Sequence, residues 1–146
     1  MANITLRYDL FRNAGAPLVG YKGNPFGYPG SCVTAQSAVF EAGAFFGASI
    51  VSAKWRVCWL PNITGASQTA VRLVSAESGP SNLQQLAAFF AGNNTTNPLN
   101  DAADITAAMQ ALVAQGDFFQ LIHQTAGDNV KAPLIYSSAI ELVVAV

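Results

Sequence analysis

The sequence is poor in charge. Only 10% of its 146 residues are Asp, Glu, Lys or Arg, against roughly 25% in an average soluble domain. The hydrophobic share is 51%, and most of the polar character comes from Asn, Gln, Ser and Thr. A surface with so few charges has little repulsion to oppose association. We therefore expect much of it to be covered by other subunits or by a large partner.

The charges that are present do not cluster. The basic residues number 7, they are scattered along the chain, and the formal net charge is −1. Nucleic-acid binding needs a clustered basic surface, and membrane-surface binding needs a Lys/Arg-rich amphipathic helix. No segment approaches the roughly 18 consecutive apolar residues of a membrane span, and the first residues lack the apolar core of a signal peptide. The sequence thus predicts no nucleic-acid partner and no membrane partner. It also predicts that the chain is made in a reducing cytoplasm.

Residues suited to catalysis are also scarce. His123 is the only histidine, and its expected strand position beside Phe119 and Leu121 favours a packed or hydrogen-bonded role over a catalytic triad. Cys32 and Cys58 are far apart and form no CxxC motif. Buried thiols are favoured over a disulfide, and no specific spacing supports the alternative of a Cys–His catalytic pair. We expect no enzymatic activity.

Metal and cofactor motifs are missing as well. Asp101 and Asp104 are the one close pair of acids, and charge at a helix N-terminus explains them. The turn at 125–129 lacks the ligand spacing of a calcium loop, zinc ligands are absent, and no glycine-rich phosphate loop occurs. The sequence predicts no metal and no cofactor.

The chain does contain clear alternation of apolar and polar residues, the pattern of strands with one buried face. It is clearest in 49–60, where one face carries Val51, Ala53, Trp55, Val57 and Trp59 and the other carries Ser52, Lys54 and Arg56. Core packing is favoured for both tryptophans. The further predicted strands are 3–12, 32–40, 68–74, 117–124 and 134–146. The turn at 61–67 makes 49–60 and 68–74 a predicted hairpin, and the apolar character of both faces of 134–146 indicates a central strand or one at a subunit interface.

Two short helices are predicted between the strands. Residues 82–91 place Leu83, Leu86 and Phe90 on one face, with a cap at Ser81 and an end at Gly92. Residues 105–114 direct Ile105, Met109, Leu112 and Val113 inward, behind a cap at Asp101 or Asp104. The predicted fold is a mostly β single domain, 1–146: an antiparallel β-sandwich of jelly-roll type with two short crossover helices. A closed barrel or a helix-on-sheet fold is the alternative.

The Gly/Pro-rich segment 20–31 is the candidate binding loop. It carries Tyr21, Asn24, Phe26 and Tyr28, and exposed aromatic rings beside an amide suit sugar stacking or protein contact. The alternative is that these rings hold their own loop to the core or fill a neighbour's surface.

The C-terminal third carries a recognisable pattern in three segments. They are Asp-Ile-Thr-Ala-Ala-Met-Gln-Ala-Leu (104–112), Gly-Asp-Phe-Phe-Gln-Leu-Ile-His-Gln-Thr-Ala-Gly-Asp (116–128) and Ala-Pro-Leu-Ile-Tyr-Ser-Ser-Ala-Ile-Glu-Leu-Val-Val (132–144). Together they resemble jelly-roll domains on the outside of tailed bacteriophage particles, namely head-decoration proteins and tail-fibre tips. The resemblance implies a jelly roll, commonly trimeric, seated on a virion that assembles in the host cytoplasm, and it carries over no functional residue.

Two functions follow as expectations. The first is a non-enzymatic structural protein of a virion, such as a capsid decoration or cement protein, whose partners are its own copies and other virion proteins. The second is a carbohydrate- or receptor-binding module, at a fibre tip or as a free lectin, which contacts a cell-surface glycan through Tyr21, Asn24, Phe26 and Tyr28.

Overall fold

The computed structural model describes residues 2–12, 18–19, 32–41, 49–76, 83–115, 118–126 and 133–146. Over these ranges the chain forms strands and one helix. In chain order they are β1 (Asn3–Arg12), β2 (Leu18–Val19), β3 (Cys32–Glu41), β4 (Ser49–Leu60), β5 (Ile63–Ala76), β6 (Leu83–Asn94), β7 (Leu99–Asp104), α1 (Thr106–Ala114), β8 (Phe118–Ala126) and β9 (Leu134–Ala145).

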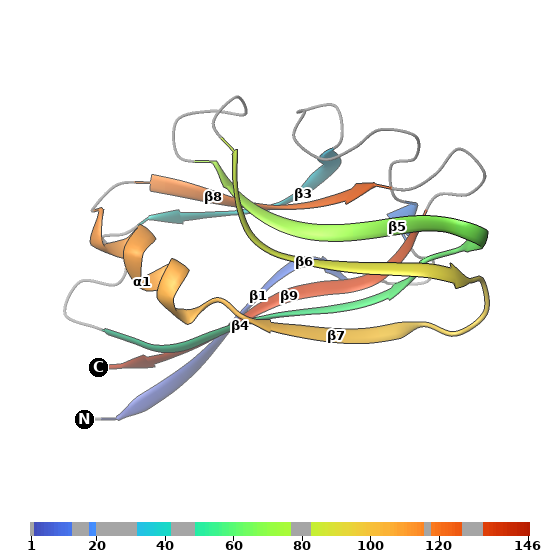
Figure 1. Ribbon diagram of the computed structural model, residues 1–146. Coiled ribbons are helices and arrows are strands. Elements are labelled where there is room, and N and C mark those ends of the chain that lie inside the picture. The colour runs from blue at the N-terminus through green and yellow to red at the C-terminus, as the bar shows by residue number, and fades with distance from the viewer. Residues whose placement is uncertain are drawn as a thin grey trace.

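The strands form two sheets that lie one over the other (Figure 1). The first has the order β1-β9-β4-β7, with β2 also paired to β9, and we call it the terminal sheet because it holds the first and last strands. The second sheet has the order β3-β8-β5-β6. Every pairing is antiparallel. The predicted central position of 134–146 is confirmed, because β9 lies between β1 and β4.

The pairing follows a nested order. With the short β2 set aside, β1 pairs with β9, β3 with β8, β4 with β7 and β5 with β6. The first strand therefore pairs with the last, the next strand inward pairs with the second-to-last, and the two innermost strands pair with each other. This is the pairing of a single long hairpin that is folded into two layers. The pairs β9–β4 and β8–β5 then join the ribbons into sheets. This is the strand order of a jelly roll, so the predicted sandwich is confirmed and the barrel and helix-on-sheet alternatives are wrong.

The core lies between the sheets. The terminal sheet contributes Trp55 and Trp59, both fully buried, as expected from the alternation in 49–60. The second sheet contributes Val71, Leu73 and Leu121, also fully buried. Side chains from both layers form a continuous apolar cluster, which is the packing that a two-layer sandwich requires.

Val51 is an exception to the predicted alternation. It was expected on the buried face, but its side chain is 48% exposed and the preceding Ile50 is buried. The β4–β9 register shifts between Ile50 and Ser52. Such a bulge adds one residue to a strand, so side chains before the bulge point to the opposite face from the one that simple alternation predicts. The sequence pattern does not reveal the bulge.

The helix predicted for 82–91 is wrong, because this segment is strand β6. Its residues pair with β5 along most of its length. Ala87, Phe89 and Ala91 pack against the core at two-residue spacing, and the Phe89 ring stacks on Trp55 with 5.1 Å between centroids. Helix propensity is a weak preference that such tertiary contacts override, so the described residues form one short helix where two were predicted.

The predicted hairpin of 49–60 with 68–74 is also wrong. Both segments are strands, but β4 belongs to the terminal sheet and β5 to the second sheet. The connection therefore crosses from one layer to the other, as the nested order demands, and a turn-rich sequence between two strands does not distinguish this crossover from a hairpin.

The helix predicted for 105–114 is confirmed as α1, which lies at one end of the sandwich (Figure 1). Ile105, Met109 and Leu112 are buried, as expected. The Asp104 carboxylate accepts hydrogen bonds from the N–H and the hydroxyl of Thr106 at the start of the helix. These bonds hold the pKa of Asp104 below its ordinary value, so this acid stabilises the helix start.

Candidate functional site

The predicted loop residues Tyr21, Asn24, Phe26 and Tyr28 lie outside the described residues, and their role stays a prediction. The site that can be built from the structure is elsewhere, on the outer face of the terminal sheet.

His123 lies in the interior of the sandwich, and the packed, hydrogen-bonded interpretation is confirmed. Its side chain is fully buried, and Nδ1 is 2.9 Å from Ser138 Oγ. The ring meets Trp55 edge-on. Burial lowers the pKa of His123 to about 3, because charging a group in an apolar core costs its hydration. The imidazole is neutral at physiological pH and is remote from any exposed nucleophile that the structure describes.

Cys58 is a free thiol on the outer side of β4. Partial burial raises the pKa of this thiol, so it is protonated and weakly nucleophilic at neutral pH. The side chain of Cys32 lies outside the described part of the structure.

Asp101 and Asp104 do not act as a pair. Trp59 Nε1 donates a 2.8 Å hydrogen bond to Asp101 Oδ2, whereas Asp104 binds Thr106. Within the described ranges no three His, Cys, Asp or Glu side chains gather as a metal ion would require. Over the same ranges, no helix combines the length and the apolar character needed to cross a bilayer.

Charged side chains gather on the outer face of the terminal sheet. Antiparallel register places Arg7 of β1, Glu141 of β9 and Lys54 of β4 in one row across three strands. The next residue along each strand, namely Tyr8, Ile140 and Trp55, forms a row on the core side. Because side chains alternate between faces, the charged row must face outward. In a chain with so few charges, this face holds a large share of them: Arg7, Asp9, Lys54, Arg56, Asp104 and Glu141.

The two arginines of this face are held in place by carboxylates. Arg7 Nε donates to Asp9 Oδ1 at 2.9 Å, and Arg56 Nε is 3.0 Å from Glu141 Oε1. A weaker contact of 3.9 Å joins Arg7 Nη1 to Glu141 Oε1. All four side chains are substantially exposed, so these pairs add little to stability. Their main effect is to orient the two guanidinium groups.

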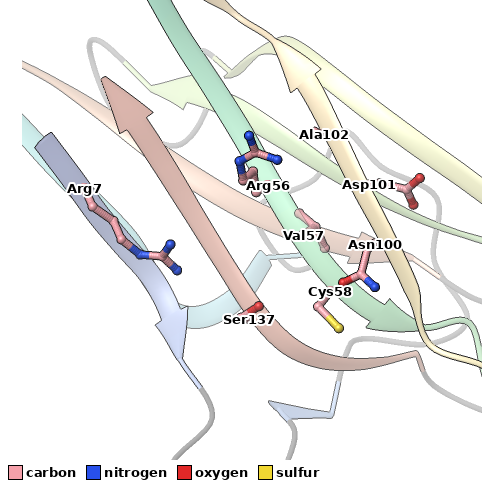
Figure 2. A pocket seen from close by; sticks show the side chains of 8 residues that line it. All are labelled: Arg7, Arg56, Val57, Cys58, Asn100, Asp101, Ala102 and Ser137. Carbon is pink, nitrogen blue, oxygen red and sulfur yellow. The ribbon is translucent and has the colours of Figure 1, made fainter. Parts of the chain in front are cut away.

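A hollow lies between the two arginines, and we call it the Arg hollow. Its volume is about 240 Å³. Figure 2 shows Arg7 and Arg56 on either side of β9, with Ser137 farther along β9 at the level of Cys58, and Asn100 near Cys58. The complete lining is Arg7, Arg56, Val57, Cys58, Asn100, Asp101, Ala102 and Ser137.

The lining of the Arg hollow is suited to hydrogen bonding. Guanidinium groups, an amide and a hydroxyl offer donors, and the Asp101 carboxyl group, which accepts from Trp59 Nε1, adds an acceptor. The sequence pattern does not reveal this site. The strand pattern does place Arg56 on the outer face of β4, but it does not show that β9 brings Arg7 alongside.

Strand order and site together define the class: a jelly-roll domain with a charged outer face on the terminal sheet. No family model matches the sequence, and no curated protein matches it. Three solved structures illustrate what is similar. A xylan-binding module, CBM15, has 13% identity and a TM-score of 0.46, with 97% of each chain covered. The infectious bursal disease virus VP2 subviral particle has 11% identity and a TM-score of 0.42, with 97% of this chain and 32% of that chain covered.

The third is the Eiger TNF from S. frugiperda, at 11% identity and a TM-score of 0.38. The match covers 67% of this chain and 61% of that chain, so this protein spans about three fifths of it. A viral capsid protein and a binding module are thus among the similar structures, and none of these three comes from a bacteriophage. At these identities and scores the matches assign neither a family nor a function.

Proposed function

We propose that this protein is a non-enzymatic structural component of a virion, such as a capsid decoration protein, and that it works as an oligomer. The observation that carries the oligomeric part of this proposal is the open edge of β6. The charge-poor composition supports it, because few like charges would oppose contact between copies. The placement on a virion rests on the resemblance of the C-terminal third and on the jelly-roll fold.

Among the strands that the structure describes, β6 is one of the two edges of the second sheet, and β3 is the other. Strand β6 is 12 residues long, and residues 78–100 contain no charged side chain. Phe90, near its middle, is 59% exposed, the most of any large apolar side chain in the described part of the chain. Natural edge strands are usually short or protected by Lys or Pro against pairing with another chain. An edge without these protections is suited to a strand of a neighbouring subunit.

Association through this edge is compatible with a closed ring. If β6 of one copy meets a different edge of the next copy, the contact is heterologous, and repetition about a threefold axis closes a trimer. We expect a trimer, as in the proteins that the C-terminal third resembles.

The test compares the molar mass of variants by light scattering coupled to size exclusion. The native chain should have three times the 15.3 kDa mass of one copy. Phe90→Lys should give monomers, because it puts a charge where an apolar contact forms, whereas Ala107→Lys on the exposed side of α1 should leave the trimer intact. A native chain that stays monomeric at millimolar concentration contradicts the oligomeric proposal.

Mass spectrometry of purified virus particles tests the virion location. If the chain is absent from every particle preparation, the virion location is refuted.

The second candidate function is carbohydrate or receptor binding, which the donor-lined Arg hollow favours. The loop residues Tyr21, Asn24, Phe26 and Tyr28 remain a separate proposal for the same function. A glycan array with Tyr21→Ala and Tyr28→Ala variants tests the loop. Unchanged binding in both variants, or no binding at all, removes the loop from consideration.

A further inference from the structure

We propose that the Arg hollow binds the carboxylate of an acidic sugar, of the uronic acid type. The inference rests on the second candidate function and assigns its ligand class and its place. Four features carry it: the orientation of the two guanidiniums, the charge balance around them, the lining, and the size of the hollow.

The guanidinium groups are oriented for a ligand. The short contacts that hold Arg7 and Arg56 both run through Nε. Within the described residues, no hydrogen bond engages the terminal Nη atoms of either arginine, and only the 3.9 Å contact to Glu141 approaches one of them. Each arginine therefore keeps a pair of N–H donors available, fixed in direction by the ion pair behind it. Paired donors of this kind match the two oxygens of a carboxylate.

The local charge favours an anion of single charge. The positive charges of Arg7 and Arg56 are opposed by the negative charges of Asp9 and Glu141, and the lining also holds the Asp101 carboxyl group, which accepts from Trp59 Nε1. A doubly charged phosphate would meet the repulsion of these acids without a net positive field to offset it. A carboxylate spreads one charge over two oxygens and can be held by the outward N–H groups alone.

The lining favours a ligand that also carries hydroxyl groups. Beside the arginines, Asn100 offers both a donor and an acceptor, and Ser137 offers a hydroxyl. None of the described residues that line the hollow is aromatic, so they offer a neutral sugar no ring to stack on. A neutral sugar would then depend on hydrogen bonds that water also makes, and an acidic sugar gains the charge-assisted bonds in addition.

The size of the hollow indicates a single sugar ring. Its volume of about 240 Å³ lies below the roughly 300–1,000 Å³ of pockets for drug-sized molecules. Its lining includes side chains that are about half exposed, Arg7 at 50% and Arg56 at 49%, so the hollow lies at the surface. A longer acidic glycan could therefore place one residue in the hollow and continue across the sheet.

The test is an NMR titration of the whole chain with methyl glucuronoside, methyl glucoside, acetate and inorganic phosphate. Methyl glucuronoside should shift resonances of Arg7, Arg56 and Asn100, and each of the other three should bind at least roughly tenfold more weakly. Methyl glucoside lacks the carboxylate, acetate lacks the ring hydroxyls that Asn100 and Ser137 would bind, and phosphate meets the repulsion of the nearby acids. Arg7→Lys and Arg56→Lys should weaken binding by a similar factor, because lysine keeps the charge and loses the paired donors. Lys54→Gln, on the same face outside the hollow, is the matched control and should bind normally.

A second readout uses Cys58 in the wall of the hollow. Bound methyl glucuronoside should slow its reaction with a thiol reagent, and peptide mapping separates this from reaction at Cys32. Equal binding of acetate or phosphate overturns the sugar assignment. Binding that survives both arginine variants and is lost in Tyr21→Ala overturns the hollow while leaving glycan binding in place. If none of the four probes binds, the inference is overturned. None of these results affects the oligomeric proposal.

Discussion

At the scale of single residues, the buried polar groups of the core connect the two sheets. Trp55 Nε1 donates to Ser138 Oγ at 2.9 Å, and the same oxygen lies 2.9 Å from His123 Nδ1. Trp55 and Ser138 belong to β4 and β9 of the terminal sheet, and His123 belongs to β8 of the second sheet. Buried polar groups are costly unless they are paired, so this cluster favours one register of one layer on the other.

Ser138→Ala tests this cluster. The change removes the acceptor of Trp55 and the partner of His123, and it leaves two polar groups unpaired in the core. We expect a loss of about 2–4 kcal/mol of unfolding free energy, since a buried group without its partner costs about 1–3 kcal/mol. Urea denaturation measures it. Ser137→Ala, the neighbour on the outer face, should change stability by less than about 0.5 kcal/mol, and equal effects of the two changes would show that the cluster has no special role.

His123 predicts a dependence of stability on pH. Its pKa falls from an ordinary 6.5 to about 3 in the folded chain, so between these values the unfolded chain binds a proton that the folded chain does not. The free energy of unfolding should therefore be unaffected by His123 above pH 6.5. It should decrease as the pH drops toward 3, by up to about 1.4 kcal/mol per pH unit. Thermal denaturation across this range compares the native chain with His123→Asn. The variant should lack this slope between pH 4 and 6.5, and identical slopes would contradict the assignment.

At the scale of elements, β6 shows why a sequence pattern can mislead. Leu83, Leu86 and Phe90 fit a helix at three- and four-residue spacing, yet Ala87, Phe89 and Ala91 fit a strand equally well. What decides between them is the stacking of Phe89 on Trp55 from the opposite sheet. That partner is distant in the sequence, so local pattern alone does not resolve the ambiguity.

The adjacent phenylalanines of β6 give a matched pair of changes. Phe89→Ala removes the ring stacked on Trp55 and leaves a space in the core, and we expect a loss of about 2–4 kcal/mol. Phe90→Ala removes a ring that is 59% exposed, so the isolated subunit should lose less than about 0.5 kcal/mol. Urea denaturation at low protein concentration measures both. If 82–91 were the helix first predicted, with Phe90 inward, the order of the two effects would be reversed.

The other elements show which parts of the fold can be predicted from the sequence. The strands at 3–12, 32–40, 49–60, 68–74, 117–124 and 134–146 and the helix at 105–114 were predicted, because alternation and helix-end signals are local. The bulge at Ile50, the crossover after β4 and the strand identity of β6 were not, because each depends on contacts with another layer or strand. The Arg hollow belongs to this second group, since it needs the register of β1, β9 and β4.

At the scale of the whole molecule, the nested strand order places the first and last strands side by side and leaves specific edges open. β1 at one edge of the terminal sheet carries the ion pair of Arg7 with Asp9. β7 at the other edge carries Asp101 and Asp104. β6 has no charge of its own. The molecule thus separates a charged face, suited to a ligand, from an uncharged edge, suited to another copy.

The most direct test of subunit pairing at the β6 edge is hydrogen exchange of the β6 backbone at two protein concentrations. If a neighbouring subunit pairs with this edge, amides of residues 83–94 should exchange slowly in a concentrated sample and faster after dilution below the association range. In Phe90→Lys they should exchange fast at both concentrations. Rates in β6 that are the same at both concentrations in the native chain, while the sample changes its state of association, would place the subunit contact elsewhere and contradict the account.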